Sequence, residues 1–156
     1  MPGQTSLVRR DCAGFTLLEV LVAVLVLSIG LLGLAGLQTQ GLRNNHSALL
    51  RSQATALAYD ALDRMRGNRD QAMLGAGSAY NTFFTTSVSS INCSSNCNSA
   101  QMAQYDLAAW KDQVGRLPAG QGQIAIDAND KATVSVRWAD TRDAANLLTI
   151  SVEALL

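Results

Sequence analysis

Residues 14–37 read GFTLLEVLVAVLVLSIGLLGLAGL, and this stretch decides how the rest of the chain is interpreted. Its last eighteen residues, 20–37, carry no charge. At a rise of about 1.5 Å per residue they would form about 27 Å of helix, close to the thickness of the hydrocarbon core of a bilayer. The stretch therefore predicts a helix that is long enough and apolar enough to span a membrane.

The charges that flank this stretch predict its orientation. Arg9 and Arg10 precede it, and no comparable basic cluster follows it directly. Because basic residues tend to remain on the cytoplasmic side of a membrane, residues 1–14 are expected in the cytoplasm. The C-terminal part of the chain is then expected on the other side.

Three interpretations of the stretch differ in how they treat Glu19. A secretory signal peptide has a basic start, an apolar segment of about 7–15 residues and a small-residue cleavage site, for which Gly33-Leu34-Ala35 would be a weak match. The apolar segment here is longer, and Glu19 lies at its start. A plain transmembrane anchor explains the length but gives no reason for a carboxylate at the membrane edge, which costs a few kcal/mol.

The third interpretation accounts for both features. Gly14-Phe15-Thr16-Leu17-Leu18-Glu19, preceded by basic residues and followed at once by the apolar segment, resembles the processing motif of type IV pilins and pseudopilins. The resemblance implies that a prepilin peptidase cuts after Gly14 on the cytoplasmic face and that Phe15 is then N-methylated. A glycine suits the position before the cut because it has no side chain to keep a peptidase away from the backbone.

The resemblance also implies a role for Glu19 in assembly. Its carboxylate would pair with the positive N-terminal amine of Phe15 on an adjoining subunit, which would favour one register of helix packing. The simpler alternative is that Glu19 reaches the headgroups near the end of the helix. The chain is accordingly expected in the inner membrane, crossing it once with a periplasmic C-terminal domain, and afterwards in a pilus at the cell surface.

The composition argues against nucleic acid as a partner, and the cysteine count agrees with removal of the first residues. The chain has 156 residues with 12 basic and 12 acidic side chains, and it lacks the basic clusters of nucleic-acid-binding proteins. Its three cysteines, Cys12, Cys93 and Cys97, are an odd number for an exported protein, and removal of residues 1–14 would leave two. Cys93 and Cys97 could then form a disulfide; a zinc site is the alternative, but it lacks the usual four ligands. No metal or cofactor is expected.

Beyond Leu37 the apolar residues recur at helical spacing, which predicts that one helix continues from Phe15 to about Arg66. His46, the only histidine, is expected to be a partly exposed helix residue without a catalytic or metal-binding role. Glycines in this helix would permit close approach of other helices in a membrane, although they also weaken a helix. They are Gly30, Gly33, Gly36 and Gly41.

The remainder of the chain predicts a small globular domain. Residues 67–100 are rich in Gly, Ser, Thr and Asn and predict a long surface loop that could include a short strand around Phe83-Phe84. Three segments near residues 124–126, 134–138 and 148–153 alternate apolar and polar residues and predict an antiparallel sheet, the last two joined through residues 140–143. Ser99 to Val114 predicts a second helix with one apolar face. The residues expected on that face are Met102, Tyr105, Ala109, Trp110 and Val114.

These predictions combine into an α+β fold, a pilin fold in which a long protruding N-terminal helix packs on a small antiparallel sheet. The expected organisation is a cleaved leader at 1–14, a helix at 15–66 whose part at 15–37 serves membrane anchoring and assembly, and a globular domain at 67–156.

Four patches narrow the resemblance to minor pilins of the PilV type, also called type IV pilus modification proteins. They are VLVAVLVLSIGLLGLAGLQ (20–38), RSQATALAYDALDRMRGNRDQA (51–72), LPAGQGQIAI (117–126) and TVSVRWAD (133–140). The likeness implies a structural subunit that primes or modifies pilus assembly at the fibre tip, in contact with other minor pilins and the major pilin. The I-type minor pseudopilin of type II secretion is the alternative, because it shares the leader and the helix.

Two other functional classes are an enzyme and an adhesin. The chain has no Gly-x-Ser-x-Gly motif, no phosphate-binding loop and no convincing pair of nucleophile and base. We therefore expect that the protein is not an enzyme. An adhesin at the fibre tip would use the Ser/Asn-rich loop around residues 85–100 as its contact surface, and this role could coexist with priming.

Overall fold

The computed structural model describes residues 14–140 and 146–156. Arg9, Arg10 and Cys12, and most of the expected connection at 140–143, lie outside the described residues. The chain divides into two compact units, one ending at Arg43 and one from Asn44 to Leu156, and each is described by itself.

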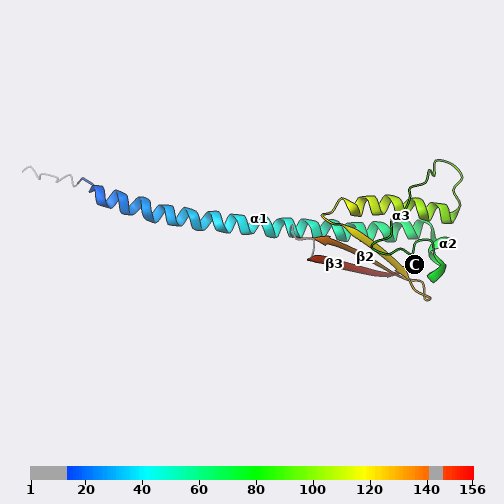
Figure 1. Ribbon diagram of the computed structural model, residues 1–156. Coiled ribbons are helices and arrows are strands. Elements are labelled where there is room, and N and C mark those ends of the chain that lie inside the picture. The colour runs from blue at the N-terminus through cyan, green and yellow to red at the C-terminus, as the bar shows by residue number, and fades with distance from the viewer. Residues whose placement is uncertain (1–13, 141–145) are drawn as a thin grey trace, which may run out of the picture. The chain divides into compact units, whose positions relative to one another are not determined.

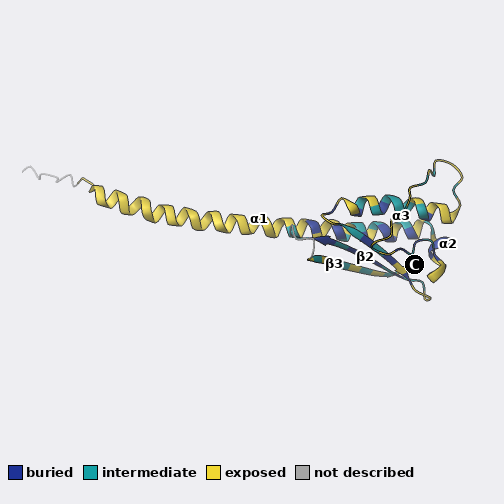
Figure 2. Cartoon of the chain, in the orientation of Figure 1, coloured by how far each residue is buried: buried dark blue, intermediate teal, exposed yellow. Residues whose placement is uncertain are grey.

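Helix α1 spans Leu17–Gly67 without interruption, which confirms the single long helix expected from the sequence (Figure 1). It begins two residues later than expected, because the chain from Gly14 to Thr16 is not helical. At its other end the amide of Asn68 still bonds to the carbonyls of Arg64 and Met65. Its residues up to 46 are all exposed among those described, whereas buried residues begin at Leu50 (Figure 2).

The unit from Asn44 to Leu156 contains a sheet of three antiparallel strands in the order β1-β2-β3. The strands are β1 (Gln121–Ile126), β2 (Lys131–Ala139) and β3 (Leu147–Leu155). Val134 of β2 pairs with Ile124 of β1 and Val152 of β3, so the apolar residues of all three strands share one face. The predicted antiparallel sheet and its alternation are confirmed.

One face of this sheet is covered by two helices, residues 44–67 of α1 and helix α3 (Ser99–Gly115). A single hydrophobic core joins them to the sheet, as the dark blue residues in Figure 2 indicate. Its largest fully buried side chains include Trp110 of α3, Trp138 of β2 and Tyr80 from the segment before α3. The fold is therefore α+β, with a long N-terminal helix and a small sheet.

The segment between the two helices corrects one expectation. Residues 67–100 are not a surface loop throughout, because they form helix α2 (Arg69–Ala72) and a 3-10 helix, η1 (Gly75–Gly77), and they bury Tyr80. No strand forms at residues 83–84; the only bridge described in this segment pairs Thr82 with Ile124. The composition is polar, but tertiary contacts with α3 and β1 bury part of the segment.

Helix α3 has nearly the predicted bounds, but its buried face agrees only in part with the one predicted. Asn98 caps it, since its side chain accepts a hydrogen bond from the amide of Gln101, whose own side chain bonds back to the amide of Asn98. Met102 and Tyr105, expected in the core, are 36% and 41% exposed. Trp110 and Val114 are buried as expected, and the other buried residues of the helix are Ala103 and Leu107.

Candidate processing and assembly site

The predicted cleavage site lies directly before α1, in backbone that is not helical. Gly14, Phe15 and Thr16 form no regular secondary structure, and Phe15 is 84% exposed. The helix starts with Thr16, whose carbonyl accepts hydrogen bonds from the amides of Glu19 (3.1 Å) and Val20 (3.3 Å). The structure thus places the Gly14–Phe15 bond just upstream of the first helical hydrogen bond.

Thr16 also caps this helix through its side chain. The hydroxyl Oγ1 of Thr16 accepts a hydrogen bond from the amide of Glu19 at 3.2 Å. In the capping-box pattern a glutamate lies three positions after a threonine N-cap, and an acidic residue in the first turn interacts favourably with the helix dipole. The sequence interpretation missed this role of Thr16, although the Thr-x-x-Glu spacing could have revealed it.

The apolar half of α1 has the length and composition of a membrane-spanning helix. Its best window has a mean hydropathy of 2.8, and none of that window is buried. A core helix of a soluble protein can be equally apolar, but it would be largely buried by its own chain. The exposure of this half therefore favours burial in a membrane or against other subunits.

Two hydroxyl side chains in this half satisfy their own hydrogen-bonding needs. Ser28 donates to the carbonyl of Val24 at 2.7 Å, and Thr39 donates to the carbonyl of Ala35 at 3.0 Å. Such bonds to the carbonyl four residues earlier leave no free donor that would be costly in an apolar environment. These polar residues are therefore compatible with an apolar surrounding.

The four glycines of this half leave open space on the helix. A β-carbon added at Gly30, Gly33, Gly36 or Gly41 would meet no atom within 4 Å. No contact with another described residue therefore requires glycine there, and the helix stays regular through all four positions. Because these glycines have no side chain, other helices can approach this part of α1 closely.

The two cysteines that would remain after cleavage form the predicted disulfide. Cys93 and Cys97 are bonded to one another, four positions apart in the sequence, in the segment that leads into α3. The bridge ends one residue before Asn98, the N-cap of α3, and Cys93 Sγ lies 3.9 Å from the carbonyl oxygen of Gln101. Among the residues that the structure describes, no group of three or more potential metal ligands is found.

Two family models match consecutive parts of the chain. The prokaryotic N-terminal methylation motif matches residues 9–35, and the family described as type IV pilin Tt1218 matches residues 36–108. The first contains the Gly14–Glu19 motif, and the second contains the packed half of α1, the disulfide and the first part of α3. The chain belongs to the type IV pilin-like superfamily. No curated protein and no solved structure matches it.

Membership of this superfamily has three consequences. The chain is a pilin-type structural subunit and not an enzyme. Its methylation motif implies processing by a prepilin peptidase and assembly with other pilins. The exposed apolar helix agrees with membrane anchoring followed by pilus assembly.

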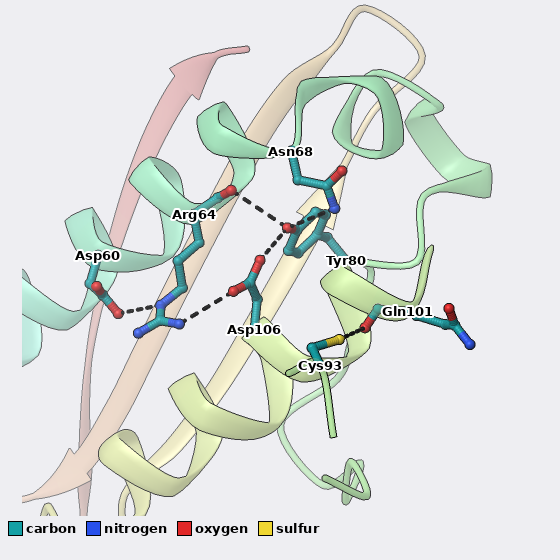
Figure 3. Close-up of polar contacts among 7 residues, drawn as sticks. All are labelled: Asp60, Arg64, Asn68, Tyr80, Cys93, Gln101 and Asp106. Atoms are coloured by element: carbon teal, nitrogen blue, oxygen red, sulfur yellow. Dashed lines mark hydrogen bonds and ion pairs between the residues drawn. The ribbon is translucent and has the colours of Figure 1, made fainter. Parts of the chain in front are cut away.

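The packed half of this pilin's long helix is held to α3 by a polar cluster that the sequence interpretation did not identify (Figure 3). Arg64 of α1 donates from Nε to Asp60 at 2.8 Å and from Nη1 to Asp106 of α3 at 3.4 Å. The side chain of Asp106 is only 13% exposed, so its charge needs partners. Arg64 and Asp106 lie forty-two positions apart, which is why no local pattern could pair them.

Tyr80 completes this cluster from the segment between the helices. Its hydroxyl donates to Asp106 at 2.6 Å, and the side-chain amide of Asn68 donates to that hydroxyl at 3.2 Å. Burial, together with the hydrogen bond to Asp106, raises the pKa of Tyr80 above its ordinary value of 10.0. Asn68 also donates to the carbonyl of Ser99, so the cluster joins the end of α1 to the start of α3.

His46 has the environment expected from the sequence. It lies on α1 and is exposed. The predicted site residues lie in two places. Gly14, Phe15 and Glu19 lie at the start of α1, and the cysteine pair lies before α3.

Proposed function

We propose that the chain is a minor pilin of the type IV pilus, which primes or modifies pilus assembly at the fibre tip. A prepilin peptidase cuts its precursor after Gly14, and Phe15 becomes the N-methylated first residue. The observation that carries this proposal is the methylation motif at residues 9–35, followed by a helix whose apolar half has no buried residue. Family membership supports the pilin role, and the PilV-like patches support the minor-pilin role.

In this proposal Glu19 is the assembly carboxylate. Its side chain is exposed on the first turn of α1, four residues after Phe15. The amine created at Phe15 by cleavage on one subunit pairs with Glu19 of an adjoining subunit, where the apolar surroundings strengthen the attraction. This pairing fixes the register of neighbouring helices in the filament.

The globular unit lies in the periplasm before assembly. The disulfide between Cys93 and Cys97 supports this orientation, because disulfides persist in oxidising compartments. Fusing alkaline phosphatase after Leu156 tests the orientation: an active fusion supports a periplasmic C-terminus, and an inactive but stable fusion contradicts it.

The processing step has a direct test. N-terminal sequencing and mass spectrometry of the chain extracted from membranes should find N-methylphenylalanine at residue 15. A chain that begins at Met1, or beyond Ala35, would refute the proposal. A Gly14→Val variant provides the control, since it should remain at precursor length.

The minor-pilin role needs a test in the cell. Deleting the gene should abolish or reduce piliation and twitching motility while exoprotein secretion continues. Loss of secretion with normal piliation would instead identify a minor pseudopilin of type II secretion. The wild-type gene should restore piliation when it is returned to the deletion strain, and a Glu19→Ala variant should not. Full rescue by Glu19→Ala would contradict the proposed role of the carboxylate in assembly.

A further inference from the structure

The sheet has an outer face, opposite to the face that packs against α1 and α3. Along β2 its side chains alternate with buried ones: Thr133, Ser135 and Arg137 are half-buried, whereas Val134 and Val136 are buried. The strand register adds polar side chains from β1 and β3 beside Ser135 and Arg137, namely Gln121, Gln123, Thr149 and Ser151. Around Arg137 the outer face therefore presents hydroxyl and amide groups.

Arg137 is held in place with part of its guanidinium unused. Its Nε donates to Oε1 of Gln121 at 2.8 Å, and its Nη2 donates to the same oxygen. The guanidinium carbon lies 4.1 Å from the centre of the Phe84 ring. A guanidinium has five N–H donors, and those on Nη1 have no acceptor within the described residues. The edge formed by Nη1 and Nη2 matches the two oxygens of a carboxylate.

The charge of Arg137 has no acidic partner in the part of the chain that the structure describes. The ion pairs found there use other cations, namely Arg64, Arg66, Arg116 and Lys131. A half-buried charge has lost part of its hydration, so it gains more from a carboxylate than a fully exposed charge does. The outer face is therefore complementary to an anionic ligand.

An aromatic ring is exposed next to this arginine. Phe83 directly precedes Phe84 and is 72% exposed. Lys111 of α3 fixes the turn that carries it, because its ammonium donates to the carbonyls of Phe83 and Thr86. The negative face of such a ring attracts the C–H groups of a sugar. A protein partner would instead favour an apolar interface core with few serines, whereas the side chains around Arg137 are polar.

We propose that the outer face of the sheet binds an acidic polysaccharide. The carboxylate of a uronic acid unit pairs with Nη1 and Nη2 of Arg137, and a sugar ring of the same polymer packs on Phe83. Hydroxyl and amide side chains of the three strands bond to the sugar hydroxyls. This activity is independent of cleavage after Gly14 and of the assembly role of Glu19.

Calorimetric titration of the full chain in detergent with oligogalacturonate, at physiological ionic strength, tests the proposal. Binding is expected, and methyl-esterified oligogalacturonate should bind about tenfold more weakly because its carboxyl groups carry no charge. Arg137→Gln and Arg137→Lys should each weaken binding by about tenfold, since lysine lacks the planar fork. Phe83→Ala should weaken it by about threefold. Arg116→Gln is the matched control and should bind like the wild type, because Arg116 is an exposed arginine paired with Asp112 at the end of α3.

Circular dichroism checks that each variant is folded, and Phe83→Ala keeps the test decisive if the Arg137 variants unfold, since its ring is exposed. The proposal is overturned by absence of binding, by equal binding of the acid and its ester, or by wild-type affinity in a folded Arg137→Gln or Phe83→Ala variant. Tighter binding of polyglutamate than of oligogalacturonate would also overturn it and assign the face to an acidic peptide. N-terminal sequencing tests cleavage after Gly14 separately.

Discussion

The indole ring of Trp110 in α3 packs against the bare α-carbon of Gly122 in β1. A β-carbon at Gly122 would overlap the six-membered ring of Trp110. The same indole donates from Nε1 to the carbonyl of Leu57 in α1 at 2.8 Å. Trp110 therefore holds α1, α3 and the sheet together, and this contact requires glycine at position 122.

Gly122→Ala is expected to destabilise the globular unit by about 1–3 kcal/mol, because the added methyl group must displace a fully buried ring. Thermal unfolding of the full chain in detergent, followed by tryptophan fluorescence, measures the effect. Gly115→Ala is the matched control, since a β-carbon there meets no atom within 4 Å and the position lies in α3. Equal midpoints for the two variants would contradict the packing described for Trp110.

The cluster around Asp106 predicts a dependence on alkaline pH. The pKa of Tyr80 is raised in the folded state, mainly by burial, so the folded chain holds this proton more tightly than the unfolded chain. The contribution of Tyr80 is thus fully present below its ordinary value of 10.0 and is lost as the pH rises above it. Tyr80→Phe should cost roughly 1–3 kcal/mol at neutral pH and remove this part of the alkaline decline.

Tyr105→Phe serves as the control for this prediction, since Tyr105 is 41% exposed on α3, the helix that carries Asp106. Chemical denaturation at several pH values above neutrality provides the measurement. If Tyr80→Phe and the wild type lose stability in parallel as the pH rises, the phenol of Tyr80 does not carry the dependence.

Lys111 is expected to hold the turn at residues 83–86. Its ammonium donates to the carbonyls of Phe83 (2.6 Å) and Thr86 (2.7 Å), and burial lowers its pKa. Lys111→Met should remove both charge-assisted bonds, cost ~2 kcal/mol and speed amide exchange in this turn. Lys131→Met is the control and should change the stability and the amide exchange of this turn little, because the ion pair of Lys131 with Glu153 is exposed. Similar exchange in the two variants would argue against the role of Lys111.

The disulfide is expected to stabilise the start of α3. Closing a loop of this length stabilises a fold by about 2 kcal/mol in the chain-entropy model, and here the loop adjoins the N-cap Asn98. The Cys93→Ser/Cys97→Ser double variant should unfold at a lower temperature than the processed wild type. Reductant should lower the unfolding temperature of the processed wild type and leave that of the double variant unchanged. Alkylation of both thiols in unreduced, exported protein would contradict the bridge.

The sequence predicted best the features that depend on short-range periodicity. The alternation in β2 is unambiguous because Val134, Val136 and Trp138 follow one another on one face, and the fold class follows from it. The face of α3 was harder to predict, since Trp110 and Val114 belong to two possible stripes. Ala103 lies on the buried face but is small, so it adds little to the apolar pattern of that face. Met102 and Tyr105 are larger apolar residues, and they favoured a face on which both prove to be exposed.

The remaining differences have a non-local origin. Tyr80 lies in a stretch whose composition is typical of a loop, yet it belongs to the hydrophobic core, and its hydroxyl bonds to the carboxylate of Asp106 and the amide of Asn68. Arg64 looks like any exposed helix residue until α3 brings Asp106 beside it. Such pairings depend on the three-dimensional arrangement of α1 and α3, which no spacing along the chain encodes.

The two edges of the sheet differ in what they can accept. The β1 edge is bridged by Thr82, whereas β3 is the other outer strand and has no fully buried residue. Ile150, Val152 and Ala154 face the core but are only partly covered. Among the described residues β3 pairs with β2 alone, so its outer edge offers unpaired amides and carbonyls, and misassembly of overproduced subunits should begin there.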